Sequence, residues 1–255
     1  MPGLSVIIIT YNEEHNIGRC IDSVKEVADE VIVLDSYSTD KTIEIATSKG
    51  AKIHQQKFAG YGEQKNDALK LATHDLVLSL DADEALDDTL IREILNEKKS
   101  PTNDGYSMNR CTNYCGRFIR HGSWYPDKKI RLFHRKMGKW SNDKIHEKIE
   151  MLPASTIKHL RGDILHYSFN SISDHVDQNN KFSSISAKFM FDKGRRTNLF
   201  KLLLNPSWAF IQSYIFRLGF LDGLYGFIIA VNISHLTFLK HSKLLTLQLS
   251  KNKTV

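Results

Sequence analysis

Short apolar runs alternate with longer segments of mixed polarity along the first part of the chain. The runs are rich in valine, isoleucine and leucine, a composition typical of strands buried on both faces of a sheet. Polar residues follow the runs, so each strand is expected to end where its run ends. The predicted strands cover residues 4–9, 31–35, 51–55 and 76–80.

Helical periodicity fills the intervals between these strands. In residues 13–28, apolar side chains recur three or four positions apart, as on one face of a helix. The hydroxyl and carboxylate groups of SYSTD (residues 36–40) are N-cap candidates for a second helix that ends near Gly50. Further helices are expected at residues 63–72 and 89–95.

Strands that alternate with helices predict an α/β fold with a doubly wound, mainly parallel sheet. The residue composition changes after this region, and aromatic, basic and glycine residues dominate residues 105–148. Strand-like segments occur at residues 106–111, 129–133 and 163–169, and a helical pattern at 171–193. We therefore expect an α/β domain over residues 1–170, with halves 1–100 and 101–170, and a helical extension over residues 171–255.

Charge divides the chain unevenly. Residues 186–255 hold ten lysines or arginines against two acids, a net charge of +8, which leaves −2 on the preceding residues. The same region contains the two most apolar stretches, at residues 199–216 and 218–238. A basic and apolar region is typical of a membrane-surface element. Basic residues do not gather in an aromatic-studded groove, so we expect no nucleic-acid partner.

Other interpretations of this extension stay open. The stretch at residues 218–238 is close to the length of a membrane span, but Asp222, Asn232 and His235 interrupt it. A pair of amphipathic helices could equally pack on the protein's own core or mediate oligomerisation. Peripheral membrane contact is the interpretation that we favour.

The cysteines indicate the compartment. Cys20, Cys111 and Cys115 are odd in number, and residues 1–5 lack the basic segment of a secretory leader. Cys111 and Cys115 have no second pair near them, which disfavours a zinc site. We expect a reduced, cytoplasmic protein, working at the inner face of the cell membrane.

Acidic and hydroxyl side chains gather where the predicted strands end. The segment 10–13 follows the first strand, Asp35 the second, and the cluster LSLDADEALDD (residues 78–88) the fourth. Ligands of open α/β sheets bind beyond the carboxyl ends of the strands. Asp81 and Asp83 together could hold a divalent cation that bridges phosphates, with magnesium or manganese suited to oxygen ligands.

The remaining acids have simpler interpretations. Asp35 could cap the helix that follows it. Asp87 and Asp88 precede the helix predicted at residues 89–95 and are expected to favour its N-terminus. Glu84 has no assigned role. Only the first part of the acidic cluster is therefore expected to matter for a ligand.

The motifs in combination resemble a known family. The segments SVIIITYNEEHNIGRCIDSV, VIVLDSYSTDKT, QKNDALKLATHDLVLSLDADE and WYPDKKIRLF are similar to those of family 2 glycosyltransferases of the GT-A fold. The likeness is greatest to bacterial lipopolysaccharide-core β-glucosyltransferases, over about residues 4–170, and GFLDGLYGF in the extension is similar too. It implies a Rossmann-like nucleotide-sugar-binding half (1–100), an acceptor-binding half (101–170), a UDP-sugar donor and a divalent cation.

The resemblance also implies roles for individual residues at the donor site. Asp81 and Asp83 correspond to the family's Asp-x-Asp motif, with Asp83 expected on the metal and Asp81 nearer the ribose or a metal-bound water. Lys65 would steady Asp35 or the diphosphate, and Asn66 is its companion in the motif. Residues expected along the uracil and ribose are Thr10, Tyr11, Glu13 and Asp35.

An inverting transfer needs a general base opposite the leaving diphosphate. We favour Glu147, in KIHEKI, over Asp127, in the loop SWYPDKKIRLF, which could instead be a structural partner of Arg131. His166 could be a third metal or phosphate contact, or a satisfied core histidine. His146 could tune Glu147 or bind metal.

The aromatic residues of the same loop have two interpretations. Trp124 and Tyr125 could form platforms for a sugar, or they could simply pack in a core. Arg131 could pair with a phosphate or with Asp127. None of these alternatives is resolved by residue type or spacing.

The expected function is transfer of a hexose, with glucose favoured, from a UDP-sugar to a lipopolysaccharide-core, glycolipid or surface-polysaccharide acceptor. A sugar nucleotidyltransferase is the alternative enzyme, but the loop TYNEEHN (residues 10–16) has no glycine and is acidic. A non-catalytic sugar-binding protein is the third class. Such a protein would not need Asp35, Asp81, Asp83 and Glu147 together.

Overall fold

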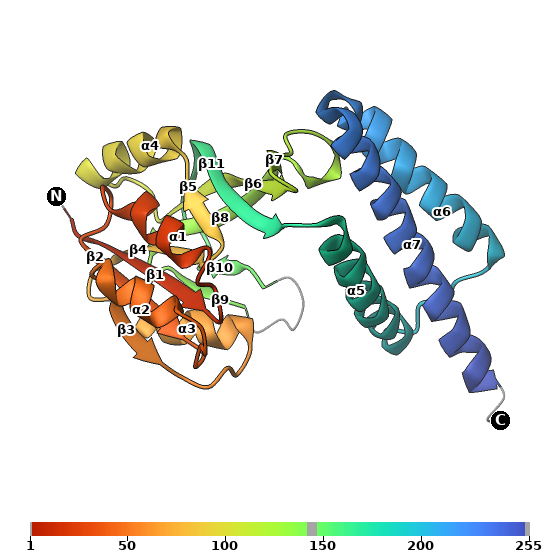
Figure 1. Ribbon diagram of the computed structural model, residues 1–255, viewed down its shortest axis with the longest axis horizontal. Coiled ribbons are helices and arrows are strands. Elements are labelled where there is room, and N and C mark those ends of the chain that lie inside the picture. Colours follow the sequence, from red (N-terminus) through yellow and green to blue (C-terminus); the bar gives the residue numbers. More distant parts are fainter. Residues whose placement is uncertain (1, 142–146, 253–255) are drawn as a thin grey trace. The chain divides into compact units, whose positions relative to one another are not determined.

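The computed structural model describes residues 2–141 and 147–252 (Figure 1). The chain forms two compact units. Unit 1 comprises Met1–Cys111 and Asp127–Tyr167, and unit 2 comprises Thr112–Pro126 and Ser168–Val255.

Unit 1 begins with a parallel half-sheet of four strands. They are β1 (Leu4–Thr10), β2 (Glu30–Asp35), β3 (Lys52–Gln55) and β4 (Leu76–Asp81), in the order β3-β2-β1-β4. The register pairs Thr10 with Asp35 and Ile9 with Asp81. The polar residues that follow the apolar runs therefore meet at one edge of the sheet, as the sequence predicted.

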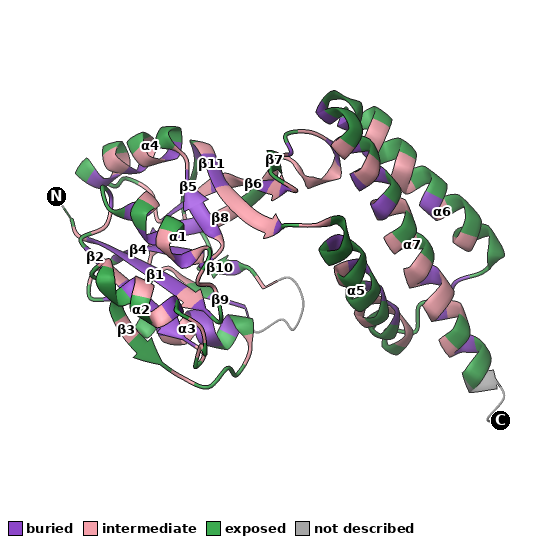
Figure 2. Ribbon diagram, viewed as in Figure 1, coloured by how far each residue is buried: buried purple, intermediate pink, exposed green. Residues whose placement is uncertain are grey.

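Four helices cover this half-sheet on its two faces. They are α1 (Ile17–Val24), α2 (Thr42–Ser48), α3 (Tyr61–Leu71) and α4 (Asp88–Lys99). Alternate β1 residues enter different clusters: Ile8 packs with α1 and α4, whereas Ile7 packs with α3. Strands β1, β2 and β4 are buried, whereas the edge strand β3 and the outer faces of the helices are exposed (Figure 2). These layers confirm the doubly wound α/β fold.

The helix predicted over residues 13–28 is shorter than expected. Helix α1 begins only at Ile17, because the preceding residues form a turn in which the N–H of Asn16 donates to the carbonyl of Glu13 at 3.0 Å. The Glu13 N–H donates to Thr42 Oγ1 at 2.8 Å. The helical pattern of apolar residues therefore continues beyond the helix, into a loop that is held by its hydrogen bond to α2.

The second half of unit 1 is largely antiparallel. β8 (Asp127–His134) pairs with β4 and with β6 (Gly105–Tyr114), and β5 (Glu84–Leu86) pairs with β11 (Ile157–Phe169). The sheet order continues β4-β8-β6-β11-β5, and β7 (Arg117–Phe118) pairs with β6. A separate ribbon joins β9 (Gly138–Trp140) to β10 (Ile149–Met151).

A cap at Asp87 starts helix α4. Its side chain accepts from the Leu90 N–H at 2.7 Å and from the Asp163 N–H at 3.0 Å. The second bond draws β11 against the helix so closely that a Cβ atom at Gly162 would lie 2.4 Å from the Leu90 nitrogen. The predicted cap role of Asp87 is confirmed.

Unit 2 is a helical assembly on an aromatic cluster. Its elements are η1 (Gly122–Trp124), α5 (Ile172–Asp192), α6 (Leu199–Ile211), the π-helical η2 (Gln212–Phe216), η3 (Gly219–Asp222) and α7 (Gly223–Asn252). Tyr114 makes edge-on contacts with Trp124, Phe169 and Tyr225. Its hydroxyl lies 3.0 Å from Nδ1 of His175 on α5. Packing, rather than sugar binding, accounts for Trp124 in this structure.

The segment Gly219–Ser250 is long and apolar enough to cross a membrane, judged by length and composition alone. Its most apolar part is one-third buried within the protein. Polar residues on α7 bond to other parts of unit 2: Asn179 Nδ2 donates to the carbonyl of Asn232 at 3.2 Å, and the Thr197 N–H donates to Gln248 at 3.0 Å.

Candidate active site at the carboxyl edge of the sheet

A cleft of about 610 Å³ opens beyond β1 and β4 in unit 1. This volume is in the range of pockets that bind drug-sized ligands and cofactors. Three groups of side chains line it: the loop after β1, the segment before α3, and the end of β4 with β11. The charged, aromatic and hydroxyl-bearing residues that line the cleft include Thr10, Tyr11, Glu13, Lys57, Phe58, Tyr61, Asp81, Asp83 and His166.

Exposed aromatic rings line the cleft. Tyr11 and Tyr61 are each 58% exposed, and the rings of Phe58 and Tyr61 meet edge to face at 5.1 Å. Burial, together with the nearby carboxylates, raises the pKa of the Tyr61 phenol. Aromatic faces of this kind can stack on a nucleobase. The sequence reasoning missed Lys57, Phe58 and Tyr61, although the aromatic and glycine-containing segment KFAGYG could have indicated them.

Asp83 and His166 face each other in the cleft. His166 Nε2 lies 3.2 Å from Asp83 Oδ2, and His166 Nδ1 is buried with no hydrogen-bond partner among residues 2–141 and 147–252. The pairing follows from the β5–β11 register, which sets His166 opposite Glu84, directly after Asp83. The backbone tightens it, since the Tyr167 N–H donates to the Asp83 carbonyl at 2.9 Å.

Asp81 points toward buried cations. Lys65 Nζ lies 2.9 Å from Asp81 Oδ1, and an Arg131 Nη2 lies 3.4 Å from Oδ2. Burial works against ionisation of Asp81, but these two cations outweigh it and hold the pKa of that carboxyl well below its usual range. Asp81 is therefore an ionised group with its counter-charges already in place.

Lys65 also contacts the favoured base. Its Nζ lies 3.1 Å from Glu147 Oε1, and the ammonium lies 4.3 Å from the centre of the Trp140 ring. The lysine side chain is only 2% exposed, whereas that of Glu147 is 22% exposed. Lys65 thus joins Asp81 to Glu147, rather than steadying Asp35.

Asn66, next to Lys65 on α3, holds the tryptophan in place. Its amide nitrogen donates to the Trp140 carbonyl at 3.0 Å, and its oxygen accepts from the Trp140 N–H at 2.9 Å. Since these bonds fix β9 against α3, Asn66 fixes the ring that lies beside the Lys65 ammonium. Asn66 is not among the residues that line the cleft.

Glu84, left unassigned by the sequence, is buried beneath the Asp-x-Asp segment. One oxygen accepts from the Asp81 N–H at 3.0 Å, and the other lies 2.9 Å from Arg131 Nη2. The buried Arg131 therefore pairs with Glu84 and Asp81 and not with Asp127, which was one of its two expected partners. Because Glu84 is one of five acids in residues 81–88, the sequence did not distinguish this supporting role from that of its neighbours.

Asp127 is held by other cations. Arg110 donates to it from Nε at 3.1 Å and from Nη2 at 2.9 Å, and Lys129 lies 3.0 Å away. The Asp127 carboxylate is therefore already engaged by cations of β6 and β8. His146, the alternative tuning residue, lies outside the described residues.

Asp35 is buried and its oxygens have partners in its own loop. It accepts from the Ser38 N–H at 2.9 Å, from the Ser38 hydroxyl, and from Gln55 Nε2 at 3.2 Å. The side chain therefore shapes the loop after β2, and Asp35 is absent from the lining of the cleft.

Glu13 and Thr10 line the cleft directly. Burial raises the pKa of Glu13, the Asn16 amide lowers it by donating at 2.8 Å, and Asp83 adds to the rise. Thr10 Oγ1 is buried and has no hydrogen-bond partner within the described part of the chain. A hydroxyl in that state can bond to a ligand.

The donor groups suit a divalent cation only in part. Asp83 offers carboxylate oxygen and His166 an imidazole nitrogen, ligands that manganese accepts. Within residues 2–141 and 147–252, no three His, Cys, Asp or Glu side chains gather as a ready-made metal site. The residues therefore fit a cation whose remaining ligands come from a bound diphosphate or water.

A parallel half-sheet followed by antiparallel strands, with Asp81 at the end of β4 and Asp83 just after it, defines the GT-A fold. The solved mannosyltransferase PcManGT from Pyrobaculum calidifontis, in complex with GDP-Man and Mn²⁺, shares this fold. The TM-score is 0.55 at 16% identity, over 96% of this chain and 87% of that one.

The family model "Glycosyl transferase family 2" matches residues 5–153, and the chain belongs to that family. An uncharacterized glycosyltransferase of Rickettsia typhi is 33% identical over 100% of this chain and 91% of its own. The lipopolysaccharide core biosynthesis glycosyltransferase LpsC of Rhizobium meliloti is 30% identical, over 94% of this chain and 91% of its own. The protein is therefore a family 2 glycosyltransferase.

Proposed function

We propose that the protein transfers a hexose, with inversion, from a UDP-sugar to a lipopolysaccharide-core or related glycolipid acceptor. The observation that carries the proposal is the cleft in unit 1, where the Asp83–His166 pair lies within reach of exposed aromatic rings. One part of such a site suits a diphosphate with its cation, and the other suits a nucleobase. Glucose is the sugar favoured by the resemblance of the motifs.

The rings and polar groups of the β1 side would hold the nucleoside. Tyr11, Phe58 and Tyr61 offer ring faces, and the unpartnered Thr10 hydroxyl can bond to a ribose or base. Lys57, in the same lining, carries a charge opposite to that of a diphosphate. Asp35 would act through the shape of its loop, since Ser38 and Gln55 already occupy its oxygens.

Asp83 and His166 would hold the divalent cation, either manganese or magnesium. When bound there, the cation stabilises the negative charge that develops on the leaving diphosphate. Asp81 would stay with Lys65 and Arg131 and accept a bond from the ribose or a metal-bound water through its remaining lone pairs. Glu84 would keep the segment in position by accepting from the Asp81 N–H.

Glu147 would accept the proton from the acceptor hydroxyl. Among the described residues, Lys65 alone forms an ion pair with Glu147, whereas Arg110 and Lys129 both engage Asp127, and this difference supports Glu147 as the base. The Lys65 ammonium lies directly against the Glu147 carboxylate. It is also equidistant, to within about 0.2 Å, from Asp81 and Glu147, so it can balance either charge.

Similarity to LpsC supports a lipopolysaccharide-core acceptor. Such acceptors are displayed on a membrane, so the proposed place of action is the cytoplasmic leaflet, with the helical extension in peripheral contact.

Slow hydrolysis of UDP-sugars in the presence of Mn²⁺ tests the donor site without the acceptor. Wild-type protein should release UDP and gain thermal stability from UDP with Mn²⁺. Asp83→Asn should lower both effects at least about tenfold, because it removes a charged ligand. Asp88→Asn, an exposed position in the first turn of α4, is the matched control and should behave as wild type.

Other outcomes would count against the proposal. No UDP-dependent stabilisation would leave the sugar-binding class in place of the enzyme. Release of pyrophosphate from UTP and a sugar 1-phosphate, with no release of UDP from a UDP-sugar, would favour the nucleotidyltransferase. Glu147→Gln and Asp127→Asn should then be compared with UDP binding monitored in both. Glu147→Gln should lose at least about a hundredfold in transfer at unchanged UDP affinity, and wild-type activity in that variant would remove the assignment.

A further inference from the structure

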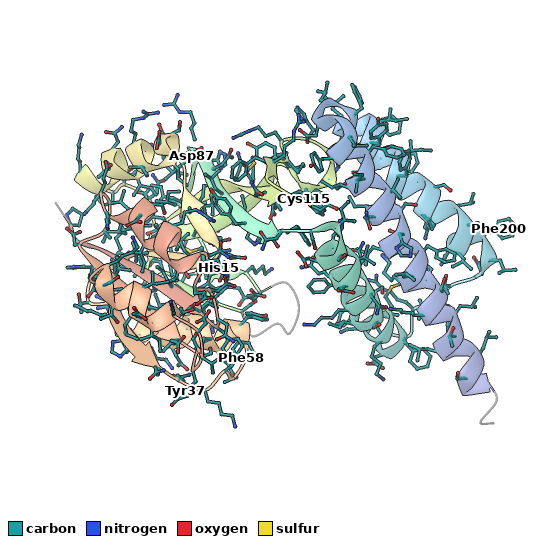
Figure 3. All side chains as sticks on the ribbon, in the orientation of Figure 1. His15, Tyr37, Phe58, Asp87, Cys115 and Phe200 are labelled. Atoms are coloured by element: carbon teal, nitrogen blue, oxygen red, sulfur yellow. The ribbon has the colours of Figure 1, made fainter. Side chains whose placement is uncertain are left out.

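Unit 2 exposes an apolar surface built from α6, η2 and the start of α7. It comprises Phe200, Leu203, Leu204, Trp208, Phe216 and Leu224, which are between 56% and 76% exposed. Figure 3 shows Phe200 projecting from α6 into solvent. Contiguous exposed apolar side chains of this size mark interaction sites, because water does not stabilise them.

The spacing of these residues explains why α6 presents them together. Phe200, Leu204 and Trp208 recur every four positions and so form a single stripe along the helix. The other side of α6 is already occupied: Pro206 is buried, and Asn205 Nδ2 lies 3.0 Å from His241 Nε2 on α7. The exposed stripe is therefore not needed to hold the helices of unit 2 together.

Positive charge borders the apolar surface. Residues 193–221 contain five lysines or arginines and no aspartate or glutamate. All five cations are exposed: Lys193, Arg195, Arg196, Lys201 and Arg217. An apolar face with cations and a tryptophan is suited to the interface of an anionic bilayer, where rings and aliphatic groups enter and ammonium and guanidinium groups meet phosphates.

The same unit argues against a membrane span. Helix α6 has 13 residues and η2 adds 5, but Lys201 and Asn205 interrupt this run, whereas a span needs about 20 predominantly apolar residues. Helix α7 is long enough, but Asn232, His241 and Gln248 bond to Asn179 and Thr197 of unit 2. Moving α7 into lipid would break those bonds with no replacement.

We propose that the α6–η2–α7 surface docks on an anionic lipid bilayer as a shallow, non-spanning anchor. Trp208 and the leucine and phenylalanine side chains enter the interface, while Arg195, Arg196 and Lys201 pair with anionic headgroups. This inference does not depend on the donor or on the reaction proposed above, so each can fail without the other. A second copy of the chain is the competing occupant.

Vesicle co-sedimentation of the full chain tests the inference. Wild-type protein should bind vesicles of phosphatidylglycerol and phosphatidylcholine at least about tenfold more strongly than pure phosphatidylcholine, and binding should weaken with salt. The triple variant Phe200→Ser, Leu203→Ser, Leu204→Ser should reduce binding at least about tenfold. Equal binding by this variant and wild type would overturn the proposal.

Matched controls separate docking from loss of folding. Ile172→Ser, Val176→Ser, Phe182→Ser changes exposed apolar residues of α5 in the same unit and should retain vesicle binding. Arg195→Glu, Arg196→Glu should abolish the preference for anionic vesicles, whereas Lys99→Glu, Lys136→Glu, with the same charge change on exposed residues of unit 1, should not.

Measured mass distinguishes the competing occupant. Light scattering measures the molar mass of the protein in detergent-free buffer. The proposal expects the mass of a monomer, or of an assembly that dissociates when vesicles are added. A stable dimer that the serine triple variant converts to monomer, without vesicle binding by either, would replace the bilayer with a second copy. If the triple variant loses its helical circular dichroism, the double variant Arg195→Glu, Arg196→Glu tests the proposal instead, because these two side chains are exposed and their change should not unfold the protein.

Discussion

Buried polar groups have different partners in the two units. In unit 1 the buried cations Lys65 and Arg131 lie against the carboxylates of Asp81, Glu84 and Glu147. In unit 2 the buried polar groups mostly meet neutral partners, as His175 meets the Tyr114 hydroxyl. Charge is concentrated in one unit and largely absent from the interior of the other.

The two units therefore differ in the desolvation penalty of their buried polar groups. Burying an ion pair removes two charges from water, and the attraction within the pair often does no more than offset that penalty. Neutral hydrogen bonds cost less to bury. The pairs around Asp81 are therefore better explained by preparation of a charged ligand site than by stability, whereas the unit 2 bonds fix how its helices meet.

Removal of Lys65 should give the largest effect. Lys65→Met leaves Asp81 and Glu147 without the ammonium between them, and we expect a loss of about 3 kcal/mol in the free energy of unfolding. Urea denaturation at neutral pH measures it. The control is Lys70→Met on the same helix, whose ion pair with Asp67 is at the surface and should contribute less than about 1 kcal/mol. Equal losses in both variants would contradict the contrast between the units.

Acid should destabilise unit 2 through His175. Burial lowers the pKa of this imidazole to about 4, from an ordinary value near 6.5. Its packing partners are the Tyr114 hydroxyl and the rings of Trp124 and Phe169, so no anion in that set stabilises a proton. Above about pH 7 the ring is neutral in both states. As the pH falls from about 6.5 toward 4, only the unfolded chain gains the proton, and stability falls by an amount on the order of 2 kcal/mol.

Urea denaturation from pH 7 to pH 4.5 checks this dependence. His175→Gln should flatten it, while His15→Gln, at the exposed position marked in Figure 3, should not. Burial also lowers the pKa of His241, and Lys240 and Lys201 add to the effect, so a smaller slope of the same sign should remain. A slope unchanged by His175→Gln would assign the acid sensitivity to other groups.

Asp87 is a carboxylate of unit 1 that serves the backbone instead of a cation. Asp87→Ala removes the bonds to the N–H groups of Leu90 and Asp163 and should cost about 1.5 kcal/mol. Asp88→Ala should stay within about 0.5 kcal/mol. Thermal or urea unfolding of both variants measures these losses. Similar losses in the two variants would contradict a capping role that belongs to Asp87 and not to Asp88.

Lys243 provides the smallest test. Its ammonium donates to neutral acceptors on α5, namely the Asn180 carbonyl and side chain and the Ser183 and Ser184 hydroxyls, all at 2.7 or 2.8 Å. Lys243→Met should lose about 1 kcal/mol. Because these four acceptors are all uncharged, the loss should be the same at about 0.1 M and about 1 M salt. A loss that disappears in salt would show an ionic contribution.

The fold was predictable because its signals are local. Apolar runs and helical periodicity located β1, β2, β4 and most of the helices, and the acidic residue before α4 was correctly expected to cap it. The start of α1 was not, since the loop before it depends on Thr42 of α2. A contact with a distant segment leaves no trace in local periodicity.

The candidate site was predictable only for the residues that follow strands. Asp81, Asp83 and the β1 loop were found from their positions. The roles of Lys65 and Glu84 depend on partners that are distant in sequence, namely Glu147 for Lys65 and Arg131 of β8 for Glu84. Phe58 comes from the irregular loop before α3, and Tyr61 is the first residue of that helix. Trp124 shows the converse, because an aromatic residue in a promising motif turned out to pack against Phe169 and His175.

The path of the chain has a practical consequence for cutting it. Unit 2 takes in Thr112–Pro126 as well as Ser168–Val255, so the polypeptide enters or leaves it at three points. A chain truncated after residue 170 would keep Tyr114 and Trp124 but lose their partners His175 and Tyr225. Protease nicking between residues 168 and 171 should accordingly leave both fragments associated until denaturant is added, because their shared aromatic cluster would otherwise meet water.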